Sequence, residues 1–255
     1  MGSVNTLLEP EIILEFLKRE VHIKEIYQKI LCQQVIEQTA QSRGVVVTPS
    51  EIQAEADRQR YQRRLESAAA TLAWLQDQMI TPEDWEAGIR DSLTARKLAE
   101  HLFANEVSKY FTEHRLDFER ISLYKVVVPY EQLAQELFYQ IEEGEISFYE
   151  AAHLYDIDER RRLQCGYEGR FYRWGLNPEI AAVVFGERVG GAIGPVQTEQ
   201  GYELLMVEEL IPAELTPEIA QGIIDQLFRE WLESELNYVI HHELHQNSRE
   251  TNDRV

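Results

Sequence analysis

The 255-residue sequence is short of cysteine, of basic residues and of long apolar runs. Two cysteines, Cys32 and Cys165, are too few for a disulfide framework. No stretch approaches the roughly 18 apolar residues of a membrane span, so we expect no membrane insertion. The start, MGSVNTLLEPE, has no basic segment followed by an apolar core, which predicts a cytoplasmic protein.

Acidic residues dominate the charge of the chain. Forty-five aspartates and glutamates against 25 lysines and arginines give a formal net charge of −20. Such a charge repels phosphate backbones and anionic lipid headgroups, so we expect no nucleic-acid partner. It either steers a basic polypeptide toward the surface or only keeps the protein soluble, and we favour solubility.

A metal site is not expected. His241 and His245 stand four residues apart, a spacing that places two ligands on one helical face. The segment lacks the H-E-x-x-H pattern, and histidines are favourable near a helix C-terminus. We interpret the pair as a polar helix end, and we expect neither a metal nor a cofactor.

Residues 1 to 120 predict about five helices. Apolar residues at helical spacing predict one long helix from Glu9 to Ser42, ended by Gly44. Three later helices open with a capping threonine followed by proline, at Thr48, Thr81 and Thr216. Glu51 completes a capping box, and Asp84 places an acid in the first turn of its helix.

The pattern changes after residue 119. The β-branched run RISLYKVVVPY (120–130) predicts a strand, and GPVQTEQGYELLMVEEL (194–210) predicts a hairpin with turns at Gly194-Pro195 and Gln200-Gly201. Two short helices, an irregular stretch at 165–176 and a helix at 177–190 lie between them. An antiparallel sheet packed against helices is the simplest arrangement, so the fold class is α+β.

The segment NPEIAAVVFGERVGGAIGPVQTEQGYELLMVEEL (177–210), with the strand and glycine-containing loop before it, resembles a parvulin-type peptidyl-prolyl isomerase domain. The flanking helices resemble the SurA-like and PrsA-like foldases. In that family a parvulin domain is inserted into a helical chaperone module. The resemblance implies an all-α N-terminal module at 1–118, a parvulin domain at 119–211, and a C-terminal helix at 212–255 that packs on the module.

The resemblance also implies a site. Parvulins carry a histidine on the first strand, a histidine after the GY of the last strand, and a cysteine or aspartate in the loop between. The matching positions here hold Lys125, Glu203 and Tyr167. We interpret Lys125 and Glu203 as an ion pair that replaces the histidines structurally. Tyr167 either hydrogen-bonds a substrate carbonyl or packs against other aromatic residues.

Substrate-binding positions follow from the same resemblance. Leu176, Ile180 and Phe185 fall where the family binds the proline ring. Arg160, Arg161 and Arg162 lie in the loop where some parvulins bind an acidic or phosphorylated residue before proline. They either bind such a residue or neutralise neighbouring acids, and we favour neutralisation.

The resemblance implies a foldase that binds unfolded or proline-containing polypeptide. Prolyl isomerisation needs no nucleophile, because it lowers a barrier to amide rotation of about 18–20 kcal/mol. Two alternatives stay open. The domain either catalyses isomerisation although its usual polar residues are replaced, or it binds polypeptide without catalysis. The alternative is an adaptor for one dedicated partner, such as a secretion component or a precursor peptide.

Overall fold

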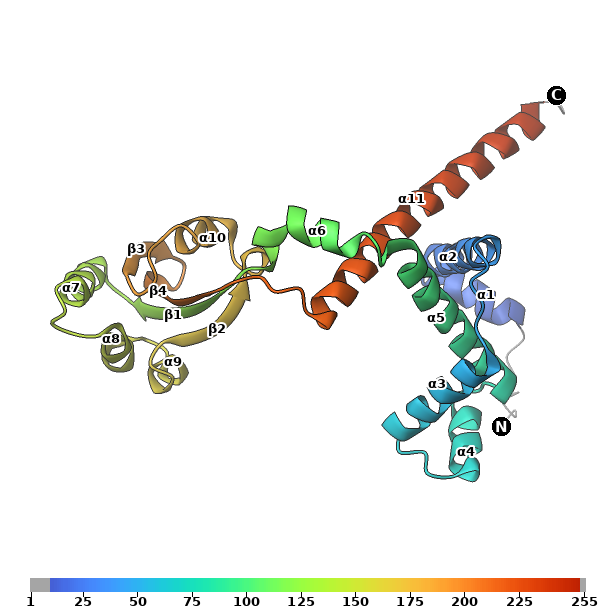
Figure 1. The fold of residues 1–255 in the computed structure, drawn as a ribbon, viewed down its shortest axis with the longest axis horizontal. Coiled ribbons are helices and arrows are strands. Elements are labelled where there is room, and N and C mark those ends of the chain that lie inside the picture. Colours follow the sequence, from blue (N-terminus) through green and yellow to red (C-terminus); the bar gives the residue numbers. More distant parts are fainter. Residues whose placement is uncertain (1–9, 253–255) are drawn as a thin grey trace. The chain divides into compact units, whose positions relative to one another are not determined.

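The structure is a computed structural model that describes the backbone of residues 10–252 and the side chains of residues 10–241. It divides into two compact units. The helical unit combines Met1–Val107 with Glu218–Val255, and the sheet unit is Ser108–Pro217 (Figure 1). The sequence-based boundaries after residues 118 and 211 fall inside the sheet unit, which also takes in nearly all of α6 (Val107–Glu113) and the 3₁₀ helix η1 (Arg115–Phe118). No helix within residues 10–252 has the length and apolar character needed to cross a bilayer.

The described part of the helical unit contains six helices: α1 (Pro10–Arg19), α2 (Ile23–Ser42), α3 (Pro49–Gln62), α4 (Ala68–Asp77), α5 (Pro82–Phe103) and α11 (Pro217–Asn252). The single helix predicted from Glu9 to Ser42 is wrong. Val21 adopts a left-handed conformation with φ of 63°, and the His22 N–H donates to the Leu17 carbonyl, which ends α1. Glu9 lies outside the described residues.

The predicted helix starts at Thr48 and Thr81 are confirmed. Each threonine side chain accepts a hydrogen bond from the backbone N–H three residues on, and Glu51 and Asp84 bond back to the threonine backbone. Glu51 also binds the Lys97 ammonium at 2.7 Å, which joins the start of α3 to α5. These bonds satisfy backbone N–H groups that a helix start leaves without partners.

Glu51 gives the helical unit a predicted acid sensitivity. The bond to Lys97 and the bonds from Thr48 lower the Glu51 pKa from 4.5 to about 2. Because the folded pKa is depressed, this stabilisation is complete above about pH 4.5 and is lost as the pH falls toward 2. In urea unfolding across this pH range, the variant Glu51→Gln therefore loses less stability on acidification than the unmodified chain. Glu143→Gln, at an exposed glutamate of the sheet unit, is the control. If the free energy of unfolding of Glu51→Gln depends on pH as strongly as that of the unmodified chain, the prediction is contradicted.

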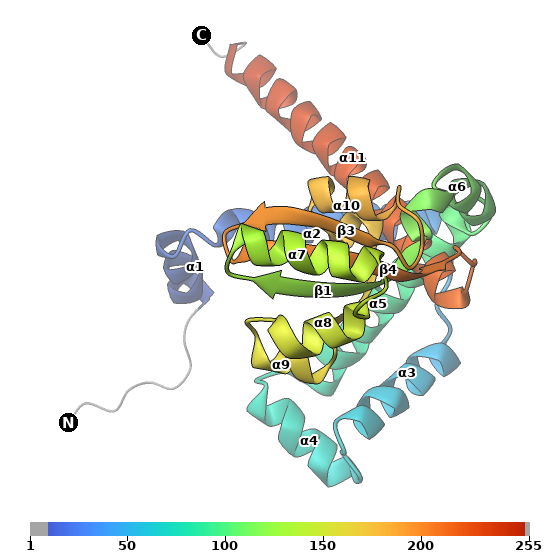
Figure 2. The same cartoon turned by 90° about the vertical axis from the view of Figure 1, so that its left-hand side faces the viewer.

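The sheet unit is a four-stranded antiparallel sheet in the order β2-β1-β4-β3. Its strands are β1 (Arg120–Val128), β2 (Tyr167–Tyr172), β3 (Ala192–Thr198) and β4 (Gly201–Ile211). The helices of the unit, besides α6, are α7 (Glu131–Glu142), α8 (Phe148–Tyr155), α9 (Glu159–Leu163) and α10 (Pro178–Val184), with the 3₁₀ helices η1 and η2 (Arg173–Gly175). Figure 2 shows α7, α8 and α10 around the strands.

Two apolar clusters lie on opposite faces of the sheet. The face under α7 and α8 buries Val126, Val128, Ala134, Leu137, Phe148, Ala151, Ala152, Leu204 and Met206. The face under α10 buries Ile121, Leu123, Val184, Ile193, Leu205 and Val207. Because side chains alternate along a strand, Lys125 and Glu203 belong to the α10 face. The α+β fold class is confirmed.

Two details of the sheet differ from the prediction. The stretch read as irregular contains strand β2, an edge strand that pairs with β1. Gly194-Pro195 is not a turn but lies within β3, where the register shifts between Ile193 and Val196. Gly194 has φ of +117°, and a Cβ there would lie 2.7 Å from the Glu203 carbonyl oxygen, so this close approach requires glycine.

Candidate functional site

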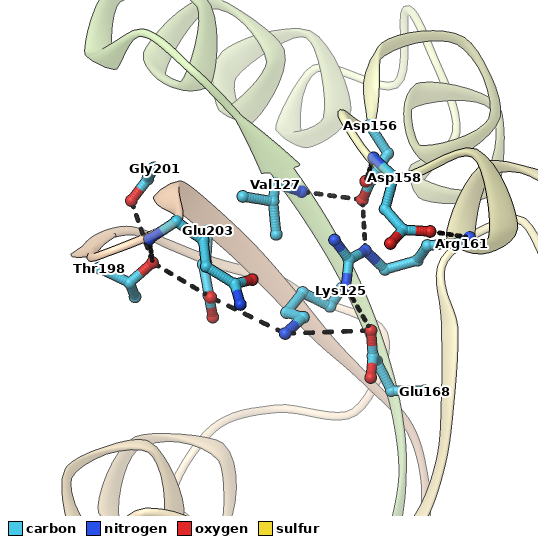
Figure 3. A network of polar contacts seen from close by, with 10 residues as sticks. Lys125, Val127, Asp156, Asp158, Arg161, Glu168, Thr198, Gly201 and Glu203 are labelled. Atoms are coloured by element: carbon cyan, nitrogen blue, oxygen red, sulfur yellow. Dashed lines mark hydrogen bonds and ion pairs between the residues drawn. The ribbon is translucent and has the colours of Figure 1, made fainter.

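Lys125 lies between two carboxylates on the α10 face of the sheet (Figure 3). Its Nζ is 3.8 Å from Glu203 Oε1 on β4 and 3.9 Å from Glu168 Oε1 on β2. These distances are those of ion pairs rather than hydrogen bonds. Glu203 is nearly buried and also accepts a hydrogen bond from the Thr198 hydroxyl at 3.2 Å. The predicted pair of Lys125 and Glu203 is therefore present, and it links the two central strands.

The same carboxylate of Glu168 continues into a second ion pair. Arg161 donates from Nη1 to Glu168 at 2.9 Å and from Nε to Asp156 at 2.7 Å. Asp156 is completely buried and also accepts from the backbone N–H groups of Val127 and Asp158. Burial lowers the pKa of the Arg161 guanidinium, but the bonds to the two acids outweigh it, so its pKa lies above the ordinary value. We call Asp156, Arg161, Glu168, Lys125 and Glu203 the ion network.

Tyr167 is not part of this network but packs against another aromatic ring, which is one of its two predicted alternatives. It pairs in register with Tyr124, and the two rings lie 5.3 Å apart on the face covered by α7 and α8. The sheet register shifts between Leu123 and Tyr124, and Glu168 occupies the extra position on β2. A difference of one residue on a strand changes the face, so Glu168 reaches Lys125 and Tyr167 does not.

Arg161 is also not free to bind a ligand in the way the family resemblance implies. Both of its acidic partners belong to this chain, and its side chain is 13% exposed. Arg162 donates to the Asp156 carbonyl at 3.4 Å. The favoured alternative, neutralisation of neighbouring acids, describes Arg161 correctly.

Leu176, Ile180 and Phe185 do come together. All three are half-buried and pack against the apolar cluster under α10. Leu176 follows η2, Ile180 lies on α10 and Phe185 ends it. Asn177 caps α10 through the N–H of Glu179, and Pro178 fixes its first residue, which sets the direction of the helix. We call these three side chains the α10 surface.

The sequence reasoning missed Asp156 and Glu168. Asp156 follows helix α8 and contacts Val127, which lies 29 residues away in the sequence. Glu168 adjoins Tyr167 and contacts Lys125, which lies 43 residues away. Residue spacing does not reveal contacts over such separations. Among the residues whose side chains are described, no group of three histidines, cysteines or acids is placed to hold a metal. The side chain of His245 is outside that set.

The ion network is predicted to contribute to stability through its partly buried lysine. Lys125→Met leaves Glu203 nearly buried without a cation, and we expect the free energy of unfolding to fall by about 1–3 kcal/mol. The double variant Lys125→Met/Glu203→Gln recovers most of this loss, because it leaves no unpaired charge. Lys29→Met, at an ion pair with Glu25 that is 68% and 60% exposed, is the control. Urea unfolding measures all three variants, and equal losses in the single and double variants contradict the prediction.

Comparisons with known proteins agree with this architecture. Residues 127–209 match the family described as Rotamase: PPIC-type PPIASE domain. The foldase protein PrsA of Caldanaerobacter subterraneus subsp. tengcongensis is 24% identical over 196 residues, covering 76% of this chain and 58% of that protein. The PrsA of Halalkalibacterium halodurans is 25% identical over 220 residues, covering 83% and 65%. The chain thus spans about 60% of the length of these curated relatives.

Solved structures include a similar protein as well. Peptidylprolyl isomerase PrsA from Bacillus anthracis superposes with a TM-score of 0.48 at 19% identity, over 84% of this chain and 97% of that one. The family match to residues 127–209 shows that the sheet unit contains a parvulin-type domain. By sequence, the chain as a whole is a relative of the PrsA-like foldases.

Proposed function

We propose that this protein is a foldase-type chaperone whose sheet unit binds proline-containing polypeptide on the α10 surface. The observation that carries the proposal is the position of three half-buried apolar side chains on the same sheet face as the ion network. Burying a proline ring against such side chains is favourable by roughly 25 cal/mol for each Å² of apolar surface removed from water. The relatives named as foldases support the same function.

The ion network is assigned a structural role. An isomerase lowers the rotation barrier by binding the twisted amide more tightly than the planar one. Each charged group of the network already has a partner within the chain, so none is held ready for the rotating amide. We expect binding with little acceleration of prolyl exchange.

The helical unit offers a second place for a client. A groove of about 550 Å³ opens between α3, α4 and α5, and its apolar lining includes Ile52, Leu72, Leu75, Trp85 and Ile89. Another of about 590 Å³ lies among α2, α5 and α11, with Cys32, Ile36 and Leu236 in its lining. Grooves of this size suit an extended or helical apolar segment held weakly. We propose that they bind unfolded chains.

Two measurements on the whole chain test the proposal. Suppressed aggregation of an unfolded client is expected, and Leu72→Asp in the first groove weakens it. Leu154→Asp, which changes an equally exposed leucine on α8, is the control. NMR exchange of alanyl-prolyl peptides, which takes tens of seconds without a catalyst, is expected to change little. Sub-second exchange contradicts the structural role of the ion network, and unchanged aggregation contradicts the chaperone role.

A dedicated partner is the second candidate. Helix α1 exposes Ile12, Ile13, Leu14 and Phe16, an apolar surface that suits one protein such as a secretion component or a precursor peptide. Tight binding to one protein, with no effect on generic unfolded chains, favours this candidate. A cytoplasmic location is part of neither function and stays a prediction, which cell fractionation tests.

A further inference from the structure

Arg173 lies directly against the α10 surface. It belongs to η2, between β2 and α10, and its guanidinium carbon is 4.3 Å from the centre of the Phe185 ring. This distance is that of a cation–π contact. A positive charge therefore adjoins the side chains to which we assign proline binding.

Arg173 has no acidic partner among the residues whose side chains the structure describes. Its Nε is buried without a hydrogen bond, and within the described side chains no carboxylate oxygen lies within 4.0 Å of its guanidinium. The chain carries 45 acidic residues against 25 basic ones, yet none of the described carboxylates pairs with Arg173. A guanidinium that no carboxylate of the chain contacts can form charge-assisted hydrogen bonds to an incoming carboxylate.

Three other arginines of the sheet unit either pair with an acid or face away from the α10 surface. Arg161 is held by Asp156 and Glu168. Arg170 lies 3.8 Å from Glu209. Arg120 also stacks on an aromatic ring, that of Tyr172, but it precedes Ile121 on β1 and so faces away from the α10 surface.

We propose that Arg173 binds a carboxylate of the polypeptide segment held on the α10 surface, so that the sheet unit prefers segments with a carboxylate beside the proline. The guanidinium carbon lies over the Phe185 ring and Nε is buried, so the two Nη groups are the donors that can form two parallel N–H···O bonds to a carboxylate. The inference rests on the proposed function, because it requires a bound segment. The carboxylate comes from an acidic side chain or from a chain terminus.

Three matched peptides distinguish these sources. The first has glutamate before proline, the second has glutamine there, and both have blocked ends. The third has glutamine before proline, ends at that proline, and keeps its C-terminal carboxylate free. Their dissociation constants are measured by NMR titration with the whole chain and with the variants Arg173→Met, Arg173→Lys and Arg120→Met.

We expect the unmodified chain to bind either the glutamate peptide or the peptide with the free terminal carboxylate about tenfold more tightly than the blocked glutamine peptide. The peptide that binds more tightly identifies the source of the carboxylate. The preference disappears in Arg173→Met, persists in part in Arg173→Lys, remains in Arg120→Met and weakens as salt is added. Equal affinities for all three peptides, or a preference that survives in Arg173→Met, overturn the inference and leave the proposed function intact. Failure of every peptide to bind the unmodified chain overturns both.

Discussion

Replacing Ile180 by aspartate is expected to abolish binding of proline-containing peptides. Ile180 packs on the apolar cluster under α10 beside Leu176 and Phe185. A carboxylate at this position has to lose water when a proline ring covers it, and it replaces the apolar side chain against which the ring packs. We expect the dissociation constant of an alanyl-prolyl peptide to rise by more than about tenfold.

Val183 provides the matched control on the same helix. It is 40% exposed and is not among the residues that pack on the cluster, so Val183→Asp adds the same charge outside the α10 surface. Calorimetric titration compares the two variants, and circular dichroism checks that both remain folded. Equal loss of affinity in the two variants, or none in Ile180→Asp, contradicts the position of the binding surface.

Replacing Asp156 by alanine is expected to give the largest loss of stability. The completely buried carboxylate accepts hydrogen bonds from the N–H groups of Val127 and Asp158 and from Arg161. Alanine leaves the two backbone donors and the Nε–H of Arg161 without an acceptor, while Arg161 Nη1 keeps its bond to Glu168. We expect the free energy of unfolding of the sheet unit to fall by about 3–5 kcal/mol.

Hydrogen exchange of the β1 amides reports this loss, because Val127 donates its own N–H to Asp156. Asp117→Ala, at a carboxylate that is 57% exposed and close to His114, is the control and is expected to change stability by less than about 0.5 kcal/mol. A loss in Asp156→Ala no greater than in the control contradicts the structural importance of the ion network.

Local sequence signals predicted the elements that local chemistry determines. The capping boxes at Thr48 and Thr81 and the β-branched run of β1 are signals of this kind. The break at Val21 has no such signal, because a β-branched residue rarely adopts positive φ. Strand β2, with the sequence YEGRFY, is a short edge strand that contains glycine and two charged residues, which hides it in the sequence.

The part of the candidate site that depends on regular strand pairing was predicted. The part that depends on the register shift of β2 and on the packing of α9 was missed. The family resemblance singled out Lys125 and Glu203, and their place on strands expected to be adjacent predicted the ion pair, which is present. The irregular register on β2 brings Glu168 to the α10 face in place of Tyr167. The partners of Arg161 depend on how α9 lies against β2, which residue spacing does not show.

The central claim is that the α10 surface binds proline-containing polypeptide. Its most direct test is a methyl NMR titration of the whole chain, labelled at isoleucine and leucine, with an alanyl-prolyl peptide. We predict that the methyl signals of Leu176 and Ile180 shift progressively and saturate, while those of Leu154 on α8 do not move. Shifts confined to other parts of the chain, or no shift at millimolar peptide, would contradict the account.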